Sequence, residues 1–269
     1  NNNTAIGANS LTLNTTGTSN VSVGRGSLGS NTTASNNTAA GDLSLNANTT
    51  GAQNTALGSG ALFANTTASN NTAVGKAALT ATTTGAANSG LGLSALSANT
   101  TGSVNVAVGK EALLSNTTGA RNTALGAQAL DANTTANDNT AIGYNSLTDN
   151  TTGTANVAVG FQSLDSNTTA SNNTAVGYNS LLSNTTGTNN VAVGHNTLDA
   201  NTTGGYNTST GTQSLTSNTT GANNTGCGFQ ALALNTTASN NTGIGYYALH
   251  QNTTGTRNVA VGANTLDAN

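Results

Sequence analysis

Residues 156–172 read N-V-A-V-G-F-Q-S-L-D-S-N-T-T-A-S-N, and residues 173–189 read N-T-A-V-G-Y-N-S-L-L-S-N-T-T-G-T-N. The same pattern continues in both directions. Steps of seventeen residues give sixteen glycines, from Gly7 to Gly262, without an insertion or a deletion. The chain of 269 residues is therefore an array of near-identical 17-residue units.

The sites of a unit are numbered here from the asparagine that lies four residues before this glycine. Site 1 is Asn and site 9 is Leu in all sixteen units. Sites 13 and 14 are Thr-Thr in every unit that contains them, and site 12 is Asn except at Thr82. The consensus is N-[TV]-A-[VIL]-G-x-x-[SA]-L-x-x-N-T-T-[GA]-x-x. A period this strict gives every unit the same surroundings, which is typical of a stacked repeat array.

Seventeen residues are too few for a helical repeat, which needs about 33 or more, but they suit one coil of a β-solenoid. The β-branched residues at sites 2 and 4 favour a strand, and the glycine at site 5 ends it. We expect a second short strand around the leucine. The Asn-Thr-Thr-Gly segment predicts a corner, because Asn and Gly tolerate positive φ. The fold predicted for residues 1–269 is all-β, a parallel β-solenoid (β-roll) with one 17-residue repeat per coil and sixteen coils.

The pattern also predicts which sites are inside. We expect the leucine at site 9 and the apolar residue at site 4 to form the core, with Cys227 as a small core residue at site 4. Site 3 points the opposite way to site 4, and we expect it to face outward. Asn at sites 1 and 12 is expected to form amide ladders. Because site 3 carries only Ala, Ser or Gly and the core is thin, we expect copies of the chain to pack together as a polymer or homotrimer.

Three segments resemble known families: N-T-A-V-G at Asn71–Gly75, N-V-A-V-G at Asn156–Gly160 and A-L-L-S-N-T-T-G at Ala112–Gly119. They resemble the repeat arrays of phage-type tail fibres and of related bacterial surface proteins, some of which end in a self-cleaving chaperone domain. They are similar, more distantly, to the head repeats of trimeric autotransporter adhesins. The resemblance covers the whole chain. It implies a β-roll or β-solenoid, usually trimeric, that serves as a spacer or adhesive shaft outside the cell.

Composition narrows the function further. Charged residues make up 5% of the chain, against about 25% in typical globular proteins. A formal net charge of -3 provides no basic surface for nucleic acid or an anionic membrane, and no stretch approaches 18 apolar residues. Because both ends fall inside the repeat pattern, we expect a segment of a longer extracellular fibre.

No arrangement of residues predicts catalysis. The two histidines, His195 and His250, occupy different sites of the unit, and the aspartates at site 10 recur far apart, for example at Asp165 and Asp199. We interpret these aspartates as solvated surface groups. No phosphate-binding loop is supported, because each glycine belongs to the repeat. We therefore expect no enzymatic activity, no cofactor and no metal.

The Asn-Thr-Thr segment has two interpretations. It is an N-x-T sequon and could carry glycans on Asn or on the Thr hydroxyls, or it could be a corner held by Asn and Thr hydrogen bonds. The candidate glycosylation sites are Asn14, Asn31, Asn48, Asn65, Asn99, Asn116, Asn133, Asn150, Asn167, Asn184, Asn201, Asn218, Asn235 and Asn252.

Site 6 becomes aromatic in the later units, and these rings could bind sugar rings or a partner chain, or pack against one another. They are Tyr144, Phe161, Tyr178, Phe229 and Tyr246. The sequence thus favours a structural or adhesive fibre shaft. The alternatives are a carbohydrate-binding solenoid and an ice-binding solenoid. The latter class presents Thr-x-Thr on one face, whereas here the paired threonines at sites 13 and 14 are adjacent.

Overall fold

The structure, a computed structural model, describes residues 2–267. These residues contain sixteen strands of three residues, one in each repeat, and no helix. The chain forms two compact units, the first ending at Asn137 and the second beginning at Asp138. Each unit is described by itself.

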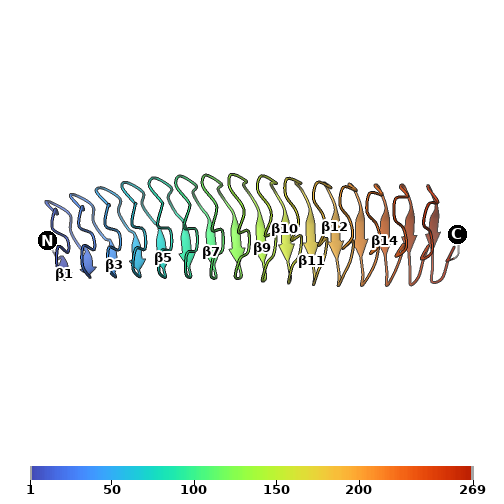
Figure 1. The fold of residues 1–269 in the computed structure, drawn as a ribbon, viewed down its shortest axis with the longest axis horizontal. Helices are drawn as coiled ribbons and strands as arrows, with labels where there is room; N and C mark the ends of the chain where they lie inside the picture. Colours follow the sequence, from blue (N-terminus) through green and yellow to red (C-terminus); the bar gives the residue numbers. More distant parts are fainter. Residues whose placement is uncertain (1, 268–269) are drawn as a thin grey trace. The chain divides into compact units, whose positions relative to one another are not determined.

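The strands of the first unit lie side by side in the order of the sequence, and all are parallel (Figure 1). Paired residues are always one repeat apart, as in Thr72 with Ser89 and Val74 with Leu91. The strands are β1 (Thr4–Ile6), β2 (Val21–Val23), β3 (Thr38–Ala40), β4 (Thr55–Leu57), β5 (Thr72–Val74), β6 (Ser89–Leu91), β7 (Val106–Val108) and β8 (Thr123–Leu125).

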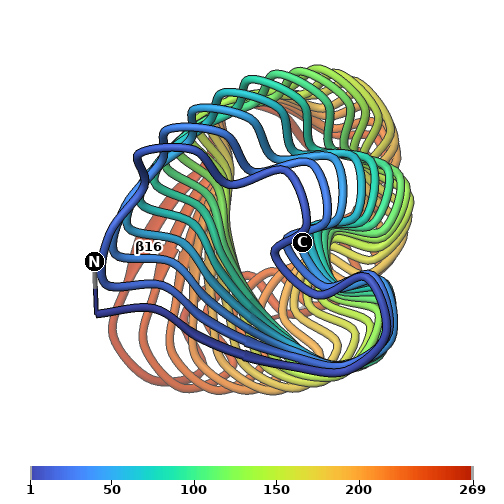
Figure 2. The ribbon, with the colours of Figure 1, turned by 90° about the vertical axis from the view of Figure 1, so that its left-hand side faces the viewer.

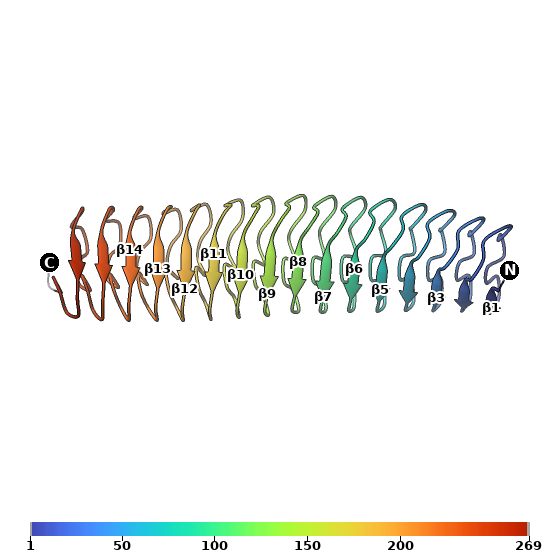
Figure 3. The same ribbon diagram turned by 180° about the vertical axis from the view of Figure 1, so that it is seen from behind.

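The second unit has the same arrangement (Figure 3). Val157 pairs with Thr174 and Val159 with Val176, again one repeat apart. The predicted all-β parallel solenoid with one repeat per coil is therefore confirmed. The strands of this unit are β9 (Thr140–Ile142), β10 (Val157–Val159), β11 (Thr174–Val176), β12 (Val191–Val193), β13 (Thr208–Thr210), β14 (Thr225–Cys227), β15 (Thr242–Ile244) and β16 (Val259–Val261).

The predicted second strand around the site 9 leucine is wrong, because this leucine has a positive φ. In the β5 coil the φ values are 131° at Gly75, 57° at Ala77, 54° at Leu79 and 57° at Ala87. A residue in this region cannot extend a strand. The positive φ angles therefore lie at sites 5, 7, 9 and 17, and not at the Asn-Thr-Thr-Gly corner where we expected them.

Backbone hydrogen bonds nevertheless join neighbouring coils around most of their circumference. The amide of Leu79 donates to the carbonyl of Ala95 at 2.9 Å, and that of Thr83 donates to Thr100 at 3.0 Å. Both partners lie in the next coil. The turns are thus stacked almost as regularly as the strands, which satisfies backbone groups that would otherwise be buried without a partner.

The interior of each coil contains site 3 and not site 4, so the expected orientation of the strand is wrong. Ala73 and Leu79 are fully buried, whereas Leu57 and Val108 at site 4 are each 37% exposed. A Cβ atom built on Gly90, at site 3, would lie 3.3 Å from the Cγ atom of Leu79. Site 3 is therefore small because it packs against the buried leucine of the preceding coil.

Two further predictions concern individual side chains. The prediction that Cys227 is a core residue is wrong, because Cys227 lies at site 4 of an outward-facing strand and is exposed. The leucines at site 9 are buried as expected, including Leu113 and Leu181. Where site 3 is Ser, its hydroxyl is bonded inside the coil, as in Ser209 donating to the carbonyl of Ser214 at 2.8 Å.

The predicted asparagine ladders are confirmed. At site 12, the Nδ2 atom of Asn65 donates to Oδ1 of Asn48 at 2.8 Å and to the carbonyl of Ala68 at 3.1 Å. At site 1, Oδ1 of Asn54 accepts the backbone N–H of Asn71 at 2.9 Å. These two ladders fix the polar corners of the coil on either side of the buried leucine.

Candidate functional site

The outward face of the strands is an uncharged surface that the packing of the single chain leaves partly exposed. We call it the outer sheet face and define it by sites 2 and 4 of each coil. Site 4 carries exposed Leu91, Leu125 and Ile142 at 38–40%, and site 2 carries Thr in ten units, Val in five and Ser in one. No charged residue occupies either site in any unit. Within a unit the eight rungs extend over about 34 Å at the usual strand spacing.

An apolar row of this kind is unusual on a soluble surface. Scattered exposed apolar residues need no explanation, but contiguous patches above a few hundred Å² mark interaction surfaces. In the end-on view of Figure 2, the coils of the first unit, coloured from blue to green, do not overlay, because each is rotated slightly from the one before. The outer sheet face of this unit therefore winds around its axis instead of lying in one plane.

The aromatic residues at site 6, which the sequence indicates as a candidate contact edge, lie in two stacks in the second unit. The ring centroids of Tyr144 and Phe161 are 5.7 Å apart, those of Phe161 and Tyr178 are 5.1 Å apart, and His195 continues the stack at 5.3 Å from Tyr178. The planes differ by 19°, 8° and 12°. The inner rings, Phe161 and Tyr178, each have a neighbour on both faces and remain 40% and 49% exposed.

The second stack is shorter. The Phe229 and Tyr246 rings lie 5.6 Å apart, with planes 15° from parallel. Tyr247 meets both edge-on, at 5.6 Å from Phe229 and 4.4 Å from Tyr246. Sugars bind aromatic rings through the ring face. In the longer stack, Phe161 and Tyr178 have a neighbouring ring on both faces, which favours packing between coils over sugar binding at these two rings.

The candidate glycosylation asparagines are the site 12 ladder. Asn14 is partly buried, and the other thirteen are fully buried. Nδ2, the atom that an N-linked sugar would modify, is engaged in hydrogen bonds, as in Asn184 donating to Asn167 at 3.0 Å and to Gly187 at 3.0 Å. A sugar on Nδ2 would displace these bonds. Glycosylation of the chain stays a prediction.

The two threonines of the corner have different roles. At site 13, the hydroxyl of Thr100 donates to the carbonyl of Thr117 at 3.1 Å in the next coil. At site 14, Thr101 and Thr118 are exposed. The exposed row at site 14 is thus the part of the Asn-Thr-Thr segment that an O-linked group could reach in the folded chain.

Charged groups are few and dispersed. Arg25 pairs with Asp42 in the next coil through bonds of 2.8 and 2.9 Å, and this hydrogen-bonded carboxylate raises the pKa of the guanidinium. Burial raises the pKa of the Asp165 carboxyl, a bond from the Thr148 hydroxyl lowers it, and the charge of Asp149 raises it. Asp165 is therefore less solvated than expected from its site.

Over residues 2–267, no group of three or more His, Cys, Asp or Glu side chains could hold a metal ion. The same residues include no helix long and apolar enough to cross a membrane. No known protein-family model matches the chain, and no curated protein matches it.

Proposed function

We propose that this chain is a segment of the shaft of an extracellular fibre, structural or adhesive, in which copies of the chain cover one another's outer sheet faces. The observation that carries the proposal is the charge-free row at sites 2 and 4. Site 4 side chains such as Leu57, Leu91 and Val108 remain 37–39% exposed in the single chain. Burying apolar surface contributes about 25 cal/mol per Å², and the gain repeats at every coil.

Geometry favours a second copy as the partner. The side chains of the outer sheet face recur once per coil, at about 4.8 Å. A partner that packs along the whole row must present the same spacing and the same winding, and another copy of this chain does so. Identical uncharged faces also meet without electrostatic repulsion. Such self-complementary contacts are the usual basis of symmetric oligomers.

Sedimentation of the chain tests the proposal. We expect the wild-type chain to sediment as an oligomer, and the double variant Leu91→Lys with Val108→Lys to sediment as a folded monomer, because two charges per copy would be buried without partners. A wild-type chain that stays monomeric at concentrations on the order of 100 μM would contradict the proposal.

The matched control places the same charges on the same two coils. In the variant Thr101→Lys with Thr118→Lys, both substitutions lie at exposed site 14. We expect this variant to remain oligomeric. If it dissociates as completely as the outer-face variant, added charge in general disrupts the assembly and the outer sheet face is not the contact.

Ice binding is the second candidate, and one observation favours it. Thr at site 2 alternates with an apolar residue at site 4 on the outward-facing side of the strand, as in Thr72 and Val74, which are both partly exposed. This row is separate from the adjacent threonines at sites 13 and 14. The winding seen in Figure 2 disfavours contact with a flat crystal over many coils. A monomeric wild-type chain that slows ice growth, with the outer-face variant inactive, would select this function over the fibre.

A further inference from the structure

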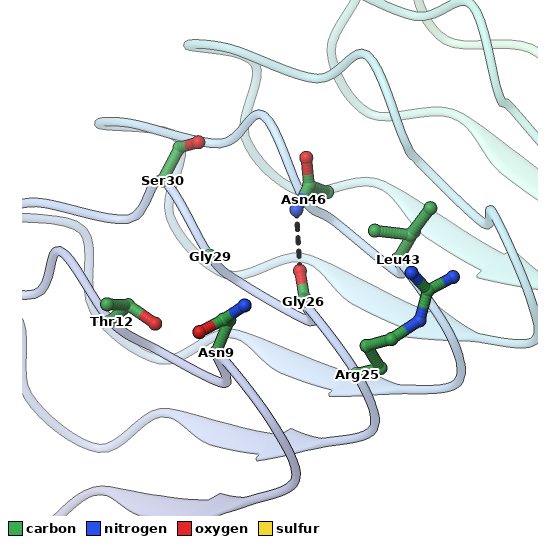
Figure 4. A pocket seen from close by; sticks show the side chains of 8 residues that line it. All are labelled: Asn9, Thr12, Arg25, Gly26, Gly29, Ser30, Leu43 and Asn46. Carbon is green, nitrogen blue, oxygen red and sulfur yellow. Dashed lines mark hydrogen bonds between the residues drawn. The ribbon is translucent and has the colours of Figure 1, made fainter.

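A notch of about 330 Å³ opens on the surface of the first unit, across the coils of β1, β2 and β3 (Figure 4). It exists because the β2 coil has glycine at two of the sites that carry side chains in its neighbours. These are Gly26 at site 7 and Gly29 at site 10. No other coil has glycine at site 10. The corresponding residues of the flanking coils, which form the walls, are Asn9, Thr12, Leu43 and Asn46.

One wall of the notch offers groups that both donate and accept hydrogen bonds. Figure 4 shows the amide of Asn9 and the hydroxyl of Thr12 on the β1 side of the glycines. Both residues are exposed, and among the described residues neither side chain has a hydrogen-bond partner. Ser30, which is partly exposed, also lines the notch, and its hydroxyl has no hydrogen-bond partner among the described residues either. An amide and two hydroxyls are suited to the hydroxyl groups of a ligand.

The floor and the other wall offer less hydrogen bonding to a ligand. Gly26 and Gly29 leave bare backbone at the floor, and Leu43 stands on the β3 side (Figure 4). The Nδ2 atom of Asn46 donates a hydrogen bond to the carbonyl of Gly26 at 2.7 Å. This carbonyl therefore already has a partner and does not need one from a ligand. The notch therefore combines a floor of glycine backbone next to Leu43 with free hydrogen-bonding side chains along one wall.

The notch has no net charge to attract an ion. Arg25 lies at its edge, but Asp42 binds the guanidinium through two bonds of 2.8 and 2.9 Å. A phosphate or carboxylate ligand would have to compete with this pair. The ligand that matches the walls is uncharged, has an apolar C–H face and carries several hydroxyls.

We propose that this notch binds a single uncharged sugar ring, whose C–H face lies on the glycine floor and Leu43 while its hydroxyls bond to Asn9 and Thr12. The volume is near the lower end of the range of about 300–1,000 Å³ for small-ligand pockets, which fits one ring and not an oligosaccharide. The site is independent of the outer sheet face. Because the notch is open and shallow, the expected affinity is weak, with a Kd on the order of 1 mM.

Saturation-transfer NMR on the full chain tests the proposal, with the methyl glycosides of glucose, galactose and mannose and with N-acetylglucosamine as probes. At least one should bind, and glycerol should not. Gly29→Thr fills the notch with the residue that site 10 carries at Thr12 and Thr80. Its Cβ would lie 3.0 Å from Nδ2 of Asn46 and 3.2 Å from the carbonyl oxygen of Gly26, so these groups have to shift by a few tenths of an ångström. We expect this variant to lose binding at least tenfold.

Two further variants complete the experiment. Gly60→Asn changes the other site 7 glycine, which has open space around it and a φ of 67°, and should bind as the wild type does. Asn9→Ala should weaken binding about tenfold without filling the notch, and it decides the case if Gly29→Thr fails to fold. No binding by any probe, or equal binding by the wild type, Gly29→Thr and Asn9→Ala, would overturn the proposal. Sedimentation of Gly29→Thr should match the wild type, which separates this site from the fibre contact.

Discussion

The Oδ1 atom of Asn65 and the hydroxyl of Thr82 are both buried in adjacent coils, and neither makes a hydrogen bond. Elsewhere in the site 12 ladder an amide fills this place, as where Asn65 itself donates to Asn48. Thr82 lacks the amide, so the ladder is interrupted there. A buried polar atom without a partner costs about 1–3 kcal/mol.

Thr82→Asn should therefore stabilise the chain, by about 1–3 kcal/mol, because the new amide can donate to Asn65. Urea unfolding and hydrogen exchange of the β4 and β5 coils measure the effect. The control is Thr84→Asn, the same substitution at an exposed site of the same coil, which should change stability by less than about 0.5 kcal/mol. An equal effect of the two variants would show that the ladder is not the cause.

Gly143 and Leu147 probe the turn and the core of one coil. Gly143 has a φ of 132°, and a Cβ there would overlap the carbonyl of Gly160. Gly143→Ala should cost about 1–3 kcal/mol, and Leu147→Ala should cost about 2–5 kcal/mol. Hydrogen exchange should show loss of protection near the β9 coil only, because coils interact with their neighbours. Uniform loosening of all coils of the second unit would contradict this picture.

The aromatic stack contributes beyond simple burial. Phe161 and Phe63 are each 40% exposed, but Phe161 has a ring on both faces while Phe63 has no ring contact among the described residues. At about 0.5–1.5 kcal/mol for each aromatic pair, Phe161→Leu should cost about 1–3 kcal/mol. Phe63→Leu should cost less than about 1 kcal/mol. Equal losses of local exchange protection would mean that stacking adds nothing.

Asp165 should make stability depend on pH. Burial raises the pKa of its carboxyl above the ordinary 3.8, so the folded chain binds its proton more tightly than the unfolded chain. Stability from this group is thus present below pH 3.8 and falls as pH rises through the raised value. Asp165→Asn should stabilise the chain at pH 7 by less than about 1 kcal/mol, because the side chain is partly solvated. In urea unfolding, the difference in stability between Asp165→Asn and the wild type should vanish near pH 3. A difference that grows on acidification would contradict this role of Asp165.

Cys227 reports whether the outer sheet face is covered. The thiol is exposed in the single chain, so in the proposed fibre it should resist iodoacetamide until the sample is diluted to monomers. The control is Thr237→Cys in a Cys227→Ser background, which moves the thiol to the exposed site 14 of the same coil. Mass spectrometry should show slow labelling of Cys227 and fast labelling of the control. Equally fast labelling of both in the assembled sample would argue against contact through this face.

The sequence specifies some features of the coil better than others. The unbroken spacing and the leucine at site 9 predict the stacked coils and the core, because these features depend on periodicity alone. The orientation of the strand was not predictable from alternation, since three residues alternate equally well with either face inward. The informative signal was size. Site 4 varies from Ala40 to Leu57, which a confined interior would not accept, whereas site 3 never exceeds Ser.

Other misses have local causes. Leucine is a poor indicator of positive φ, and Leu79 adopts it because the buried side chain and the bond to Ala95 offset the strain. The sequence does not predict the notch at Gly26 and Gly29, because sites 7 and 10 vary from unit to unit and a glycine there looks like any other neutral substitution. Only the stacking of three coils shows that the two glycines empty one continuous space.

The constant offset of one repeat between paired residues has a consequence for heredity. Deleting or duplicating a whole unit leaves the strands, the buried leucines and the asparagine ladders in register, whereas losing a single residue shifts all later pairs. Recombination between repeats within the gene would thus shorten or lengthen the array by about 4.8 Å for each unit while its core and its outer sheet face keep the same pattern. The number of repeats determines the length of the array. Selection can therefore change this length without changing the sequence of the repeat.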